Sequence, residues 1–114
     1  MSDVKPDAQV AQVERLVGEA IRTLPEPLRS AAEELLIVVD GTGRTGLYGL
    51  FDGAPRGSSD AEALPPRITI YARALAEDFP TDTELKSEVR KTLVHEIGHY
   101  LGLEESDLAG RGLE

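Results

Sequence analysis

Apolar residues recur every three or four positions over residues 7–23. This spacing places them on one face of a helix and leaves polar residues on the other face. The apolar positions are Val10, Val13, Leu16, Val17, Ala20 and Ile21. Pro25 and Pro27 end this predicted helix. Residues 28–34 can form a short second helix, because proline is tolerated at the start of a helix.

Three short apolar segments in the middle of the chain are typical of β-strands. Residues 35–39 form a continuous apolar run rich in β-branched residues, which predicts a buried strand. Residues 46–53 predict a second strand that is weakened by its glycines, and residues 67–71 predict a third strand after two prolines. Residues 54–66 are rich in Gly, Pro and Ser, so we expect an irregular surface loop there.

A second long helix is predicted near the C-terminus. Residues 81–84 (Thr-Asp-Thr-Glu) match a capping box, in which a hydroxyl and a glutamate satisfy free N–H groups at a helix start. The helical spacing is then kept by Leu85, Val89, Thr92, Leu93, Glu96, Ile97 and Leu101. Gly102 suits the end of this helix, because glycine tolerates the left-handed conformation.

The length of 114 residues suits one domain. We therefore expect a single α+β domain over residues 1–114, with an N-terminal helix, a short β-sheet and a long C-terminal helix.

The overall charge of the chain disfavours two classes of binding partner. The formal net charge of −9 disfavours binding to nucleic acid or anionic membranes, because both require a basic surface. The chain has no cysteine, which fits a reducing compartment. Residues 1–6 lack the apolar run of a secretory signal, and no segment approaches the roughly 20 apolar residues of a membrane span. We expect a cytoplasmic protein without nucleic-acid or membrane partners, and its oligomeric state stays open.

Both histidines of the chain lie in one stretch of the predicted C-terminal helix, residues 95–99 (His-Glu-Ile-Gly-His). The stretch matches H-E-x-x-H, a pattern in which two histidines bind zinc and the glutamate is a general base. His95 and His99 lie one helical turn apart on one face, so both imidazoles can reach one Zn²⁺. Glu96 is offset by one residue and can accept the proton of a water activated by the zinc. The other interpretation is two ordinary helix histidines.

A catalytic zinc site needs a third protein ligand. Gly102 allows the chain to turn back under the helix, and Glu105 has the spacing that best returns a carboxylate to the metal. Asp107 and Glu104 are the alternatives. These acids can also be solvated residues near a helix end, so the sequence leaves the third ligand open while favouring Glu105.

The extended pattern H-E-x-x-H-x-x-G-x-x-E resembles the zincin metallopeptidases. Asp-zincins carry Asp at its last position and metzincins carry His. The chain as a whole resembles the small bacterial minimal-zincin family of metallopeptidases, and residues 47–53, 64–71 and 94–108 carry this likeness. The resemblance implies zinc-dependent hydrolysis of a peptide or protein substrate. It also implies an active-site helix packed under a small mixed sheet. An edge strand beside the cleft, here residues 67–71 or 47–51, would align the substrate.

Two departures from these families support an alternative function. The third-ligand position holds Glu105, whose side chain is one methylene longer than Asp. The methionine turn of metzincins is missing, because Met1 is the only methionine. The alternative is a non-catalytic metal-binding or protein-interaction domain on a zincin scaffold.

Two other features carry no functional prediction. Residues 41–46 match G-x-G-x-x-G, but a dinucleotide site needs a helix directly afterwards and a strand is predicted there, so we expect a turn. Tyr48, Tyr71 and Tyr100 could stabilise an oxyanion, but tyrosines are more often core-edge residues, and none is assigned.

Overall fold

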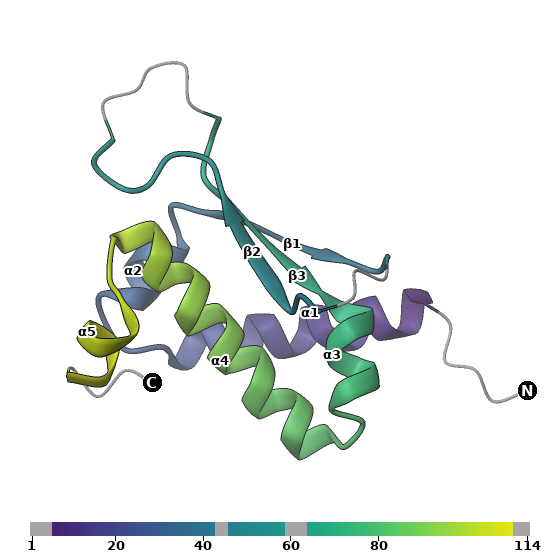
Figure 1. The fold of residues 1–114 in the computed structure, drawn as a ribbon. Coiled ribbons are helices and arrows are strands. Elements are labelled where there is room, and N and C mark those ends of the chain that lie inside the picture. The colour runs from purple at the N-terminus through teal and green to yellow at the C-terminus, as the bar shows by residue number, and fades with distance from the viewer. Residues whose placement is uncertain (1–5, 43–45, 59–63, 111–114) are drawn as a thin grey trace, which may run out of the picture.

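A mixed α and β architecture is seen in the structure, a computed structural model that describes residues 6–42, 46–58 and 64–110. Within these residues the elements in chain order are α1 (Pro6–Thr23), α2 (Leu28–Ala32), β1 (Leu36–Asp40), β2 (Gly49–Asp52), β3 (Arg67–Tyr71), α3 (Ala72–Asp78), α4 (Asp82–Leu101) and α5 (Glu105–Gly110). Figure 1 shows α1 and α4 lying together on one side of the small sheet. The predicted α+β fold is confirmed.

The three strands form a mixed sheet in the order β1-β3-β2. The central strand β3 runs parallel to β1 and antiparallel to β2, with Ile68 opposite Ile37 and Phe51. The strand predicted at residues 35–39 is present as β1, but the prediction that it is buried is wrong, because β1 lies at a sheet edge and Leu36 is 58% exposed. Residues 67–71 have a strand on each side, so the prediction that they could be an edge strand is also wrong, and β2 is the edge strand packed against α4.

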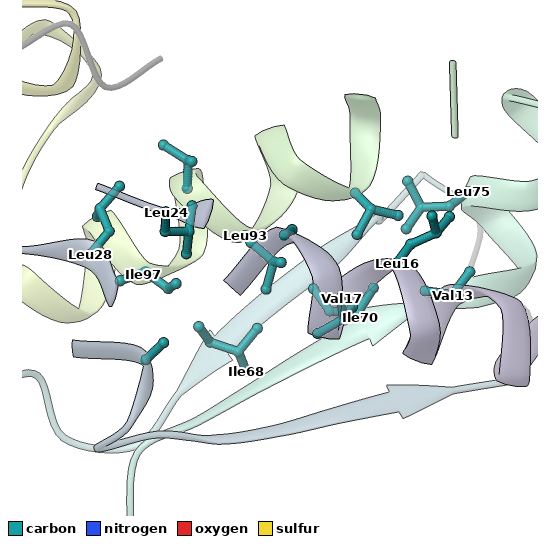
Figure 2. Packing of buried hydrophobic residues seen from close by; sticks show 14 of the residues in the cluster. Val13, Leu16, Val17, Leu24, Leu28, Ile68, Ile70, Leu75, Leu93 and Ile97 are labelled. Carbon is teal, nitrogen blue, oxygen red and sulfur yellow. The ribbon is translucent and has the colours of Figure 1, made fainter. Parts of the chain in front are cut away.

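The hydrophobic core lies between β3 and the two long helices. Ile68 and Ile70 of β3 are fully buried. Figure 2 shows them beside apolar side chains of α1 and α4. Those from α1 are Val13, Leu16 and Val17, and those from α4 are Leu93 and Ile97. The apolar stripe predicted for residues 7–23 therefore faces the core, and burying it is what holds α1 against the sheet.

Two short helices were not predicted. α3 follows β3 without an intervening turn, and α5 has only six residues. A segment this short shows little periodicity, so its helical form depends on packing against the rest of the fold.

The regions predicted as turn and loop are described in part. Residues 43–45 of the glycine-rich turn and 59–63 of the loop lie outside the described residues. The strand β2 follows Gly46, so the helix that a dinucleotide site requires is not present there. Residues 54–58 and 64–66 form neither helix nor strand. In the described part of the chain, no helix is long and apolar enough to cross a membrane.

Candidate metal centre

The helix α4 carries the H-E-x-x-H stretch in its last two turns. It begins after Thr81, whose Oγ1 accepts a hydrogen bond from the Glu84 N–H at 3.2 Å, as the capping box predicts. It ends at Gly102, which adopts the left-handed conformation with φ of 74°. The Leu103 N–H then bonds the Gly98 carbonyl at 2.8 Å. This cap satisfies carbonyls that would otherwise lack partners, and so holds the turn that carries the motif.

Three side chains of α4 converge where the motif predicts a metal site. Each of His95, Glu96 and His99 offers a ligand atom, and these atoms lie within 4.8 Å of one another. The two imidazole rings have centroids 4.4 Å apart at an interplanar angle of 65°. Both histidines are partly open to solvent. Two imidazole nitrogens and a carboxylate oxygen are ligands that zinc accepts, so this donor set fits a divalent metal ion.

Glu96 is the buried member of this group. It is only 8% exposed, and its Oε1 lies 3.3 Å from Nδ1 of His99. A buried carboxylate is costly unless it is paired, and the carboxylate of Glu96 lies beside the imidazole of His99. The sequence placed Glu96 off the ligand face. In the structure it lies close enough to both histidines to share their site.

Gly49 of β2 makes the burial of Glu96 possible. A Cβ at this position would lie 2.6 Å from Cγ2 of Thr92 and 3.3 Å from Cγ of Glu96. The strand therefore approaches α4 at a distance that only glycine permits. The sequence alone indicates only that Gly49 weakens a strand. The tertiary structure gives it a positioning role next to Glu96.

Glu105 begins α5, which folds back against α4. Its Oε1 lies 3.7 Å from Nδ1 of His95, and its side chain is 78% exposed. The return of α5 depends on Gly98, where a Cβ would lie 3.1 Å from Cδ1 of Leu108. Glu105 is thus brought next to His95, but it is not a member of the group of three. Its role as the third ligand stays a prediction.

The two alternative third ligands differ in their surroundings. Oδ2 of Asp107 accepts a hydrogen bond from the Glu104 N–H at 3.0 Å, which caps the start of α5. This contact gives Asp107 a structural role. Glu104 is exposed and precedes α5. The geometry therefore favours Glu105 over both.

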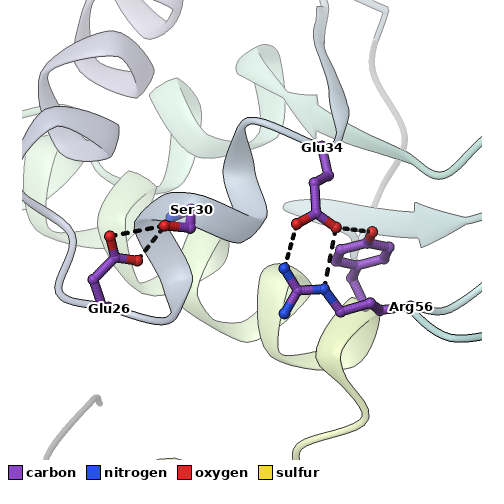
Figure 3. Close-up of polar contacts among 5 residues, drawn as sticks. Glu26, Ser30, Glu34 and Arg56 are labelled. Atoms are coloured by element: carbon purple, nitrogen blue, oxygen red, sulfur yellow. Dashed lines mark hydrogen bonds and ion pairs between the residues drawn. The ribbon is translucent and has the colours of Figure 1, made fainter.

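A polar network of Glu34, Arg56 and Tyr100 holds the last turn of α4. Figure 3 shows Glu34 meeting the guanidinium of Arg56, and the Tyr100 hydroxyl donates to Oε1 of Glu34 at 2.6 Å. The Arg56 backbone N–H also donates to the Tyr100 carbonyl at 2.9 Å. Because Tyr100 follows His99, these bonds restrain the backbone that carries a candidate metal ligand. Figure 3 also shows the Glu26 carboxylate accepting hydrogen bonds from the backbone N–H and the hydroxyl of Ser30 in α2.

The network shifts the ionisation of its members. Hydrogen bonds from Arg56 and then Tyr100 lower the pKa of the Glu34 carboxyl below its ordinary value of 4.5. The bond to Glu34 raises the pKa of the Tyr100 hydroxyl above its ordinary value of 10.0. A lowered carboxyl pKa stabilises the fold above pH 4.5, and this contribution is lost as the pH falls through the lowered value.

We expect Glu34→Gln to destabilise the protein at pH 7 and to have a diminishing effect below the ordinary carboxyl pKa of 4.5. Protonation removes the charge of Glu34 in the wild type, so the two proteins converge in acid. Urea unfolding at a series of pH values measures this difference. Glu33→Gln is the matched control, because Glu33 is exposed and lies outside the network. A stability difference that stays constant throughout the acid range would contradict the role of the Glu34 charge.

A hollow adjoins the three converging residues His95, Glu96 and His99. It has a volume of about 290 Å³ and is lined by Lys91, Val94 and His95 of α4 and by Leu108 of α5. Its mostly apolar walls open next to His95. A side chain of a bound molecule could therefore be held beside the three converging residues.

Comparisons with known proteins place the chain in a family. A family model described as zincin-like metallopeptidase matches residues 27–113. No curated protein matches the sequence. Among solved structures, the chain is similar to a conserved hypothetical protein from Thermo thermophilus, with 24% identity and a TM-score of 0.46. That match covers 94% of this chain and 99% of the other chain.

Proposed function

The chain belongs to the zincin-like metallopeptidase family, and from this premise we propose that it is a zinc-dependent peptidase. The observation that carries the proposal is the convergence of His95, Glu96 and His99, with Glu96 buried between the helix and the edge strand. Family membership alone implies a metal site. A buried carboxylate held beside two half-exposed imidazoles is the arrangement that hydrolysis requires.

In the proposed site each side chain has one role. His95, His99 and Glu105 would hold the metal ion, and a bound zinc would supply Lewis-acid polarisation of the scissile carbonyl and acidify a water molecule. Glu96 takes the proton of the attacking water and passes it to the leaving amine. Its limited exposure keeps the carboxylate fixed and excludes bulk water from it.

The proposed substrate is a peptide or protein in an extended conformation. β2 is the edge strand on the α4 side of the sheet, and Gly49 brings it against Glu96. An edge strand offers unpaired backbone groups to which a peptide can add as a further strand. We therefore assign substrate alignment to residues 49–52. The cytoplasmic location and the lack of nucleic-acid and membrane partners stay predictions from the sequence.

Protein purified without a histidine tag or chelator should bind about one zinc per chain and cleave members of a peptide library. Elemental analysis and mass spectrometry of the products measure the two properties. A chelator should abolish cleavage, and added zinc should restore it. His95→Ala and His99→Ala should each lose the metal. Zinc-loaded wild type that cleaves no member of a broad library would count against the peptidase proposal.

The third ligand has its own test. Glu105→Ala should weaken zinc affinity by at least about tenfold, because loss of even an outer-shell partner of a metal site costs that much. Glu104→Ala removes the neighbouring charge without removing the contact to His95, and serves as the matched control. Competition with a chelating dye measures both affinities. If Glu105→Ala binds zinc as tightly as the wild type, Glu105 is not a ligand, and a loss of affinity confined to Glu104→Ala would assign that role to Glu104.

One observation favours a second candidate function. The Glu105 side chain is largely exposed and is not a member of the converging group. Two histidines with a weakly held third ligand suit a metal-binding or protein-interaction domain that does not hydrolyse peptides. This candidate gains if the Glu96→Gln protein keeps full biological function in cells, and it fails if that substitution abolishes function.

A further inference from the structure

A second hollow lies between α1 and α4, away from the metal centre, and its walls are rich in cations. Its volume is about 570 Å³. Arg22 from the last turn of α1 and Lys86 and Arg90 from α4 line it. Thr83 and Ser87 of α4, which carry hydroxyl groups, also line it. The lining of this hollow is therefore positively charged, although the protein as a whole has a net charge of −9.

The positive charge of this hollow is balanced only in part from within the protein, because Glu19 is the one acid among its lining residues. Among the ion pairs of the described residues, none involves Arg22, Lys86 or Arg90. The two nearby acids have other partners, since Glu19 pairs with Arg15 at 3.3 Å and Oδ1 of Asp82 accepts a hydrogen bond from Gln12 at 3.0 Å.

Favourable charge pairs along the helices account for these cations only in part. Lys86 lies four residues after Asp82, a favourable spacing, but Arg90 lies four residues after Lys86, where like charges repel and destabilise the helix. Arg22 is favourable at the C-terminal end of α1, where a cation meets the negative end of the helix dipole. That reason does not extend to Lys86 and Arg90, because neither lies in the last turn of α4.

The donors of the hollow match a phosphate group. Arg22 and Arg90 lie on facing helices, and each guanidinium can donate two parallel hydrogen bonds to an oxyanion. The Thr83 and Ser87 hydroxyls make no hydrogen bond with the described residues, so both are available as donors. Three cations and Glu19 leave a local charge of about +2, which balances the charge of about −1.5 to −2 on a phosphate monoester.

We propose that the hollow between α1 and α4 binds a phosphate monoester, held by Arg22, Lys86 and Arg90. The site is independent of the metal centre. Arg90 and His95 are five residues apart, which is about 140° around the helix, so they face different directions. The proposal therefore does not rest on peptidase activity, and its test does not measure cleavage.

The test is a titration followed by amide NMR shifts, with inorganic phosphate and a phosphoserine peptide as probes. Both should cause saturable shifts centred on Arg22, Thr83, Ser87 and Arg90, and the unphosphorylated peptide should cause none. Tighter binding of the phosphopeptide would assign a peptide-borne phosphate as the source. Equal or tighter binding of inorganic phosphate would assign a small phosphate.

Two variants and one control test whether Arg22 and Arg90 bind the phosphate. Arg22→Gln and Arg90→Gln should each weaken binding by about tenfold or more, because each removes charged hydrogen bonds to the ligand. Arg29→Gln is the matched control, since Arg29 is an exposed arginine of α2 outside the hollow. Equal weakening by all three variants would overturn the proposal in favour of general charge attraction. Shifts centred on His95 and His99, or no saturation, would also overturn it.

Discussion

Glu96→Gln is expected to reduce peptide cleavage by about 10²- to 10⁴-fold while zinc stays bound. The substitution keeps the size of the side chain and its place between α4 and β2. It removes the carboxylate that accepts a proton, whereas His95 and His99 still offer their nitrogens. Cleavage rates of zinc-loaded proteins, normalised to the metal content of each preparation, measure the effect.

The matched control for this variant is Glu84→Gln. Glu84 lies on the same helix, is exposed, and contributes its backbone N–H rather than its carboxylate to the Thr81 cap. The same change in net charge is therefore made far from the metal centre, and cleavage should be unchanged. If Glu96→Gln retains wild-type rates at full zinc occupancy, Glu96 is not the general base.

Gly49→Ala is expected to lower both stability and cleavage. The added Cβ would lie 2.6 Å from Cγ2 of Thr92, a β-branched side chain with little freedom on a helix. Thr92 is further held because its Oγ1 donates to the Glu88 carbonyl at 2.8 Å. Overpacking of this kind costs about 1–3 kcal/mol of unfolding free energy. Displacing Glu96 as well should reduce cleavage by on the order of 10²-fold.

Urea unfolding and cleavage assays measure the two effects of Gly49→Ala. Gly18→Ala in α1 is the control, because its Cβ would meet Arg22 only at an ordinary contact of 3.7 Å. Alanine is the better helix former, so this control should be neutral or slightly stabilising. A Gly49→Ala protein as stable and as active as the Gly18→Ala protein would show that the strand does not need to approach α4 so closely.

The helices α1 and α4 could be predicted from the sequence because the patterns that indicate them lie within a few neighbouring residues. The apolar stripe of residues 7–23 and the capping box at Thr81 depend on spacings of three and four residues, and α1 and α4 form there. The structure corrects the position of the strands in the sheet. Residues 35–39 were predicted to be buried because they are apolar, but strand order is set by pairing with distant segments, and β1 is an edge.

The candidate metal centre also combines features that follow from local spacing with features that depend on tertiary packing. His95 and His99 converge because helix geometry brings residues four apart to one face, whatever the rest of the chain does. The position of Glu105 required a second helix to fold back, which depends on Leu108 fitting against Gly98. Spacing alone could favour Glu105 over Glu104 and Asp107, but it could not reveal that Asp107 caps α5.

By itself, the sequence determined the helix that bears the metal-competent histidines and the chemistry that their pattern implies. Both follow from contacts within one helical turn. Only the tertiary structure decided that Gly49 packs against Glu96, and that Arg22 faces Lys86 and Arg90 across a shared hollow. These groups lie far apart in the chain, and they meet only because burial of one common core brings β2 and α1 against α4.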